Sequence, residues 1–150
     1  MKIRRATISD ARKIHSLINS LAKRELMLPR ALNEIFENLR DHYICEDDGK
    51  IVGVCAMHIL WEDLAEIRSL AVSNDRQRQG IGRKLVKKCL AEAKKLGIEK
   101  IFVLTYTPEF FRSLGFTETD KNRLPQKIWG DCLRCHKFPE CDETALIKAL

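Results

Sequence analysis

The chain has 150 residues and a formal net charge of +6, with 45% hydrophobic and 32% charged residues. These values are typical of a single globular domain, residues 1–150, with a core of ordinary size. They argue against a membrane protein, because no apolar run approaches the roughly 18–20 residues of a membrane helix.

The positive charge is scattered along the chain and forms no basic run interleaved with aromatic residues, so nucleic acid is not an expected partner. The same charge suits a polyanionic cofactor or an acidic substrate. The first residues, Met1–Thr7, lack the apolar core of a secretion signal. A cytoplasmic location away from membranes is therefore expected.

The first half of the chain is predicted to contain a strand, two helices and a hairpin. The strand covers residues 2–6, and capping side chains at Thr7–Asp10 begin a helix with an apolar stripe. A break at Pro29 precedes a second helix over residues 30–40, whose predicted inward side chains are Leu32, Ile35, Phe36 and Leu39. A turn containing Asp48-Gly49 then joins strands over residues 43–46 and 51–60.

Residues 64–97 are the most informative stretch and are predicted as strand, glycine-rich turn and long helix. Glycines in the turn, Gln77–Gly82, let the backbone pass close to a ligand. The unpaired N–H groups of the first helical turn and the positive end of the helix dipole suit a pyrophosphate. A tight connection without a ligand is the alternative. A strand over residues 100–105 and a short helix from Pro108 follow.

The turn Gln77-Arg78-Gln79-Gly80-Ile81-Gly82 resembles the coenzyme-A-binding motif of the GNAT N-acetyltransferases, Arg/Gln-x-x-Gly-x-Gly/Ala. Residues 110–116 are similar to that family's Phe-Tyr-x-x-x-Gly-Phe signature. The resemblance implies an α/β (α+β mixed) GNAT fold with a central, mostly antiparallel mixed sheet flanked by helices. It also implies acetyl-CoA as co-substrate, bound by Leu70, Ala71, Val72, Gln77, Arg78, Gln79, Gly80, Ile81, Gly82 and Arg83.

Transfer of an acetyl group to an amine needs a base for the amine and a proton or positive neighbour for the leaving thiolate. Glu66 is the candidate base, because the family carries a Glu that activates the amine on this strand. A salt bridge with Arg68, two residues away on the same strand face, is the alternative. Phe111 stands where many members have a tyrosine, so Tyr106 is the candidate general acid, with strand-end packing as its alternative role. Thr105, Thr107, or departure of the thiolate unaided or through water are the other possibilities for this step.

Several segments, among them Leu28-Pro29-Arg30, Cys55–Trp61 and Ala65–Val72, resemble the acetyltransferase domain of N-acetylglutamate synthases, here without the kinase domain of the longer enzymes. That resemblance implies L-glutamate as acceptor, in arginine biosynthesis, with Arg30 gripping a carboxylate. Ser69, Lys127 and Arg134 are the other candidate acceptor-binding residues. A local role in capping carbonyls is the alternative for Arg30.

The cysteines are read mainly as reduced thiols. Cys132, Cys135 and Cys141 supply one C-x-x-C pair where the strong zinc signature has two, so no metal is expected and these three are only weak candidates. Cys45, Cys55 and Cys89 fall in predicted strands and helices and are expected in the core.

Two other functions remain open from the sequence. One is a GNAT acetyltransferase that acts on a protein N-terminus, a lysine or a small amine. The other, from a different class, is a non-catalytic module that binds coenzyme A or a metal and regulates a partner. The sequence leaves the oligomeric state undetermined, with a homodimer among the allowed outcomes, and it does not reveal feedback by arginine.

Overall fold

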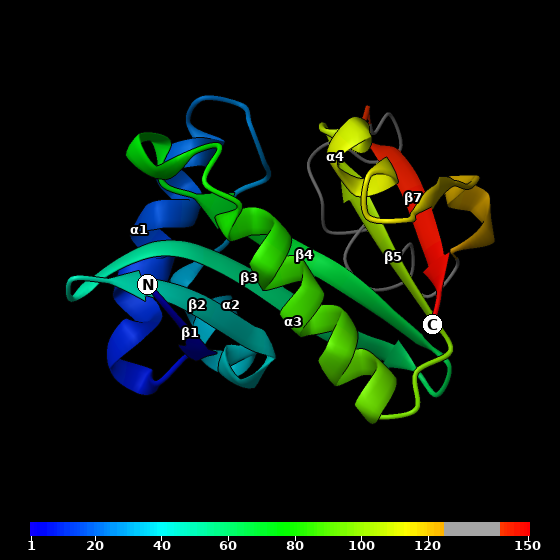
Figure 1. Cartoon of the computed structure of the whole chain (residues 1–150), viewed down its shortest axis with the longest axis horizontal. Coiled ribbons are helices and arrows are strands. Elements are labelled where there is room, and N and C mark those ends of the chain that lie inside the picture. The colour runs from blue at the N-terminus through cyan, green and yellow to red at the C-terminus, as the bar shows by residue number, and fades with distance from the viewer. Residues whose placement is uncertain (125–141) are drawn as a thin grey trace.

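The computed structural model describes residues 1–124 and 142–150, in which one seven-stranded mixed sheet is flanked by helices (Figure 1). The strand order is β1-β2-β3-β4-β5-β7-β6. Only β4 and β5 pair in parallel in the described part, and the other neighbours are antiparallel. The predicted mostly antiparallel mixed sheet is thus confirmed. The strands are β1 Lys2–Arg5, β2 His42–Asp47, β3 Lys50–Trp61, β4 Leu64–Val72, β5 Lys100–Thr105, β6 Thr117–Glu118 and β7 Thr144–Ala149.

Helices cover both faces of this sheet. The long helix α3 (Ile81–Lys95) packs on one face, and α1 (Ala11–Ala22) with α2 (Leu32–Glu37) packs on the other. The short helix α4 (Pro108–Arg112) follows β5. A Cβ on Gly53 would lie 2.8 Å from Ile81 Cγ2, so this glycine lets α3 approach β3 closely. The close packing fixes the N-terminus of α3 relative to the sheet.

The first helices agree with the sequence in place but differ in length. The Thr7 N–H donates to Asp10 Oδ2 at 2.7 Å, which confirms the predicted cap before α1. The second helix is shorter than the predicted residues 30–40. It covers Leu32–Glu37, and at Asn38 the backbone leaves the helical region, with φ −111° and ψ 23°, before the chain continues as a 3₁₀ turn. Phe36 was predicted to face inward, and this is wrong, since it is 38% exposed.

The parallel strands β4 and β5 separate halfway along their length. Their pairing runs from Leu64↔Lys100 to Ile67↔Val103, although β4 continues to Val72. Figure 1 shows β4 and β5 diverging along their length. The register of β4 against β3 also shifts between Val54 and Ala56, which places a bulge near Ser69, a residue with φ of +55°. A bulge bends its strand and re-aims the side chains that follow, and the candidate site lies at this part of β4.

Candidate active site

The turn before α3 has the backbone of an anion-binding helix start. Arg78 and Gly80 both have positive φ, +63° and +79°, and Gly80 is the N-cap of α3. The first intrahelical bond runs from the Lys84 N–H to the Gly80 carbonyl at 3.1 Å, so the N–H groups of residues 81–83 precede the helical ladder. Such groups, with the helix dipole behind them, suit a phosphate.

The side chains of this predicted cofactor set have different environments. Gln77 donates its amide to the Val72 carbonyl at 2.7 Å and so ties the turn to the end of β4. Ile81 is 1% exposed and belongs to the core, which leaves only its backbone for a ligand. The side chains of Arg78, Gln79 and Arg83 are exposed at the surface around the turn. A Cβ on Gly82 would lie 3.5 Å from the ring of Phe110, an ordinary contact, so alanine would fit there.

The other predicted cofactor residues lie in the second half of β4. Leu70 and Val72 pack against the α3 side of the core, whereas Ala71 is buried on the α1 side. Because the ladder with β5 ends at Ile67, the backbone of these residues lies beyond the paired part of the two strands. Their peptide groups take no part in the β4–β5 ladder and could contact a ligand.

Glu66 lies on β4 just before the bulge and is 3% exposed. Arg68 Nε donates to Glu66 Oε1 at 2.5 Å, so the ion pair considered as an alternative role is present. The side chains of this pair are 10% and 4% exposed for Arg68 and Glu66. Across the sheet Glu66 stands opposite His58 on β3 and Phe102 on β5. The pairing with Arg68 fixes one carboxylate oxygen and is compatible with a role of Glu66 as a base.

Tyr106 follows the end of β5, and its hydroxyl donates to Asp142 Oδ1 at 3.0 Å. Nearby, Phe111 on α4 is 2% exposed and packs edge-on against Phe110 and Phe116. The hydroxyl of Tyr106, the candidate acid, is thus engaged with Asp142, and Phe111 belongs to the core.

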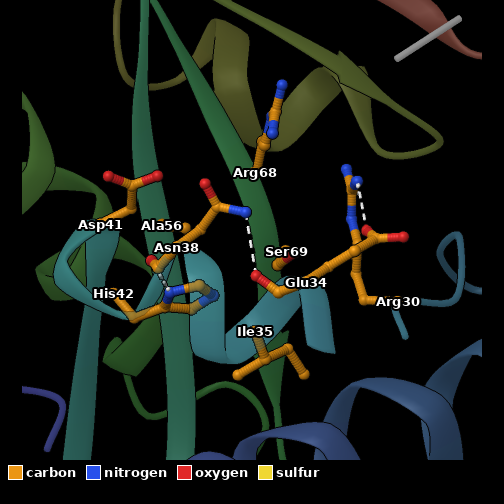
Figure 2. Close-up of a pocket in the computed structure, with 9 residues that line it drawn as sticks. All are labelled: Arg30, Glu34, Ile35, Asn38, Asp41, His42, Ala56, Arg68 and Ser69. Atoms are coloured by element: carbon orange, nitrogen blue, oxygen red, sulfur yellow. Dashed lines mark hydrogen bonds and ion pairs between the residues drawn. The ribbon is translucent and has the colours of Figure 1, made fainter. Parts of the chain in front are cut away.

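A shallow hollow, open to solvent, lies on the α2 side of the sheet (Figure 2). Its lining includes Arg30, His42, Arg68 and Ser69, and so joins two of the predicted acceptor residues. The Arg30 backbone is held from both sides by Asn19, whose amide donates to the Arg30 carbonyl at 3.0 Å and whose oxygen accepts from the Arg30 N–H at 3.3 Å. The guanidinium of Arg30 contacts Glu34 at 3.5 Å and faces the hollow.

His42 is a buried residue of this hollow that the sequence did not single out. Its Nδ1 lies 2.9 Å from the Asn38 carbonyl, which can only accept, so Nδ1 carries the proton. Burial is the largest cause that lowers the pKa of His42 below its usual value, the contact with Asn38 opposes it, and the charge of Arg30 lowers it further. His58 on β3 is partly exposed, and its Nδ1 lies 2.6 Å from Asp41 Oδ2.

The remaining predicted residues, Lys127, Arg134, Cys132, Cys135 and Cys141, lie outside the residues that the structure describes. Within residues 1–124 and 142–150, no three or more metal-binding side chains come together. Cys45, Cys55 and Cys89 are buried, as expected. Among the described helices none is both long and apolar enough to cross a membrane.

Comparison with known sequences places the chain among acetyltransferases. A family model described as acetyltransferase (GNAT) family matches residues 9–118. An uncharacterized N-acetyltransferase of Chlorobaculum tepidum is 40% identical over 148 residues, which are 99% of this chain and 96% of that protein. The amino-acid acetyltransferase of Mycobacterium tuberculosis is 34% identical over 137 residues, 89% and 78% of the two chains. The amino-acid acetyltransferase of Azotobacter vinelandii is 33% identical, but this chain spans only 29% of its length.

Solved structures give the same result. A Mycobacterium tuberculosis protein in complex with CoA superposes with a TM-score of 0.86 at 29% identity, covering 100% of this chain and 99% of that one. The N-acetylglutamate synthase of Neisseria gonorrhoeae, complexed with coenzyme A and N-acetyl-glutamate, superposes with a TM-score of 0.88 at 28% identity, covering 99% of this chain and 35% of that one. With the family model matching most of the chain and the sheet and helices arranged as in these structures, the protein belongs to the acetyltransferase (GNAT) family.

Proposed function

We propose that the protein transfers the acetyl group of acetyl-CoA to the α-amine of L-glutamate. The observation that carries this proposal is the hollow beside the buried carboxylate of Glu66, because two guanidinium groups, Arg30 and Arg68, line it. A guanidinium matches a carboxylate through paired hydrogen bonds, and glutamate has two carboxylates. The relatives named amino-acid acetyltransferase support the same acceptor class.

Acetyl-CoA is assigned to the turn before α3 and to the end of β4. The N–H groups of residues 81–83 would hold the pyrophosphate, and the backbone of Leu70–Val72 would hold the pantetheine arm and the thioester carbonyl. Coenzyme A in the structures from Mycobacterium tuberculosis and Neisseria gonorrhoeae supports this assignment.

In the proposed reaction the amine of the acceptor loses a proton to Glu66, directly or through a water molecule. The amine nitrogen then bonds to the thioester carbon, and the carbon–sulfur bond breaks as the tetrahedral intermediate collapses. The leaving thiolate takes a proton, for which Tyr106 is the candidate donor once its hydroxyl leaves Asp142. A cytoplasmic location, a place in arginine biosynthesis and a single domain over residues 1–150 belong to the same proposal.

The first test measures free thiol released from acetyl-CoA in the presence of each of the twenty amino acids, a short peptide and a polyamine. L-glutamate is expected to give the highest kcat/KM. A preference for the peptide or the polyamine would refute the acceptor assignment and leave the fold and the family unchanged. No thiol release with any acceptor, from protein that binds coenzyme A, would favour the non-catalytic module.

The second test replaces Arg30. Arg30→Ala should raise the KM for glutamate by roughly 10- to 150-fold, the loss of a charge-assisted hydrogen bond of about 1.5–3 kcal/mol, and leave the KM for acetyl-CoA unchanged. Arg30→Lys should restore part of the affinity, because an ammonium cannot form the paired contact. The matched control is Arg24→Ala, an exposed arginine in the same connection after α1. Unchanged glutamate kinetics with a lower unfolding temperature would make Arg30 a structural residue.

A further inference from the structure

Both arginines of the hollow already contact a protein carboxylate, but the two contacts differ. Arg30 meets Glu34 at 3.5 Å, and the Glu34 side chain is 47% exposed. Arg68 meets Glu66 at 2.5 Å, and both side chains are almost buried. The first contact is therefore long and open to exchange with a ligand. The second is short and shielded from water, and it involves the candidate base.

The sheet register brings Arg68 to the hollow and to Glu66 at the same time. His42, Ala56 and Arg68 form one row across β2, β3 and β4, and Glu66 lies in the next row on the same face. The small side chain of Ala56 in the middle of the row leaves space above the sheet between His42 and Arg68. In Figure 2 the guanidinium groups of Arg30 and Arg68, which come from different elements, point toward the same side of the hollow.

A guanidinium carries donors on three nitrogens and can contact two carboxylates at once. We propose that Arg68 binds the α-carboxylate of the acceptor while its Nε holds Glu66, so that one residue both recognises an α-amino acid and sets the position of the base. The α-amine and the α-carboxylate are attached to the same carbon, so a carboxylate on Arg68 brings the amine next to Glu66. Arg30 then takes the second carboxylate at the far end of the acceptor.

This inference rests on the proposed function and adds a division of labour that can be measured with two acceptor analogues. 4-Aminobutyrate keeps the side-chain carboxylate of glutamate and lacks the α-carboxylate, whereas L-2-aminobutyrate keeps the α-carboxylate and lacks the other. The inhibition constants of both against glutamate are measured at saturating acetyl-CoA. Arg68→Met should raise the inhibition constant of L-2-aminobutyrate by roughly 10- to 150-fold and leave that of 4-aminobutyrate nearly unchanged. Arg30→Ala should do the opposite.

The positioning of Glu66 is tested with a double-mutant cycle on kcat. Arg68→Met should lower kcat in the wild-type background but have little further effect in Glu66→Gln, because the group that it positions is already gone. The effect of Arg68→Met on L-2-aminobutyrate should persist in both backgrounds. Arg68→Lys should regain part of the affinity and little of the kcat. The single variant Arg68→Met leaves Glu66 without its ion-pair partner and could fail to fold. In that case the double variant Glu66→Gln/Arg68→Met, which lacks both buried charges, is compared with Glu66→Gln, and the inhibition constants of the two aminobutyrates are measured for both proteins.

Equal effects of Arg68→Met on the two analogues, or an undiminished loss of kcat in the Glu66→Gln background, would overturn the inference and leave the glutamate assignment standing. A wild-type protein that prefers an acceptor without an α-carboxylate would overturn the proposed function and the carboxylate role of Arg68 together. The kcat cycle, run with that acceptor, would then still decide whether Arg68 positions Glu66.

Discussion

Gly80 offers a test of the cofactor site in which the effect of charge can be separated from the effect of backbone strain. The residue caps α3 in the left-handed region, with φ +79° and ψ 9°, and an added Cβ would meet no heavy atom within 4 Å. A side chain there costs conformational energy without crowding a neighbour. Asn and Asp enter the left-handed region more readily than other non-glycine residues and have nearly the same shape. Gly80→Asn and Gly80→Asp therefore share their strain and differ by one negative charge.

The size of the charge effect follows from Coulomb's law. Two unit charges 4 Å apart repel by about 1 kcal/mol in bulk water and about 4 kcal/mol at the effective dielectric constant of a protein surface. If the pyrophosphate sits on the N–H groups of residues 81–83, Gly80→Asp should bind coenzyme A about 5- to 700-fold more weakly than Gly80→Asn. Titration calorimetry with coenzyme A measures both variants, and added salt should narrow the difference.

Gly97→Asp is the matched control for this comparison. Gly97 also has a left-handed φ, +87°, and open space around its missing Cβ. It lies beyond the far end of the 15-residue helix α3, which is itself about 22 Å long, so its charge should not affect coenzyme A binding. Equal affinities of folded Gly80→Asp and Gly80→Asn for coenzyme A would mean that the phosphates do not lie at this turn. The assignment of the cofactor site from the Gln77–Gly82 motif would then be refuted.

Two further substitutions test the role of Glu66 as the base and the stability of the folded protein at acid pH. Glu66→Gln should lower kcat at pH 7 by roughly 10²–10⁴-fold, with a smaller loss at high pH where the free amine is abundant; wild-type turnover at pH 7 would reduce Glu66 to an ion-pair partner. The hydrogen bond from Arg4 is the main cause that lowers the pKa of Asp10 to about 2 from 3.8. The ionised Asp10 therefore stabilises the folded protein by about 2 kcal/mol above pH 4, and this contribution is lost as the pH falls toward 2. In urea unfolding Arg4→Met should flatten this pH dependence, and parallel curves for the two proteins would contradict it.

The parts of the fold that the sequence predicted are those that depend on local pattern. The strand, turn and helix of residues 64–97 could be predicted because glycine position and apolar spacing act over a few residues. The end of α2 could not, because it depends on the non-helical backbone conformation of Asn38, which the spacing of apolar residues does not reveal. Phe36 was predicted to face inward and is 38% exposed, because the spacing of apolar residues alone does not show how wide the buried face of a helix is.

Only part of the candidate acceptor site could be predicted from the sequence, because strand register brings together residues that are distant along the chain. Arg30 could be selected from a resemblance, and Arg68 could be selected as a neighbour of Glu66 on one strand face. The row of His42, Ala56 and Arg68 could not be read from the sequence, since its members are 14 and 12 residues apart along the chain and meet only through the pairings of β2, β3 and β4. The sequence did not single out Asn19, whose side chain holds the Arg30 backbone across 11 residues of chain.

The bulge near Ser69 shows most clearly what strict alternation misses. A period of two would place residues 66, 68, 70 and 72 on one face of β4. In the structure residues 66 and 68 share a face with Ala71, whereas Leu70 and Val72 join the α3 side of the core. The alternation of inward and outward side chains shifts by one residue at Ser69, which has a φ of +55°. This left-handed conformation costs a non-glycine residue about 1–3 kcal/mol. The shift separates two parts of β4: before it, the Arg68 side chain lines the hollow, and after it, the backbone lies beyond the pairing with β5. One strand can thus serve an acceptor through its side chains and a thioester through its peptide groups.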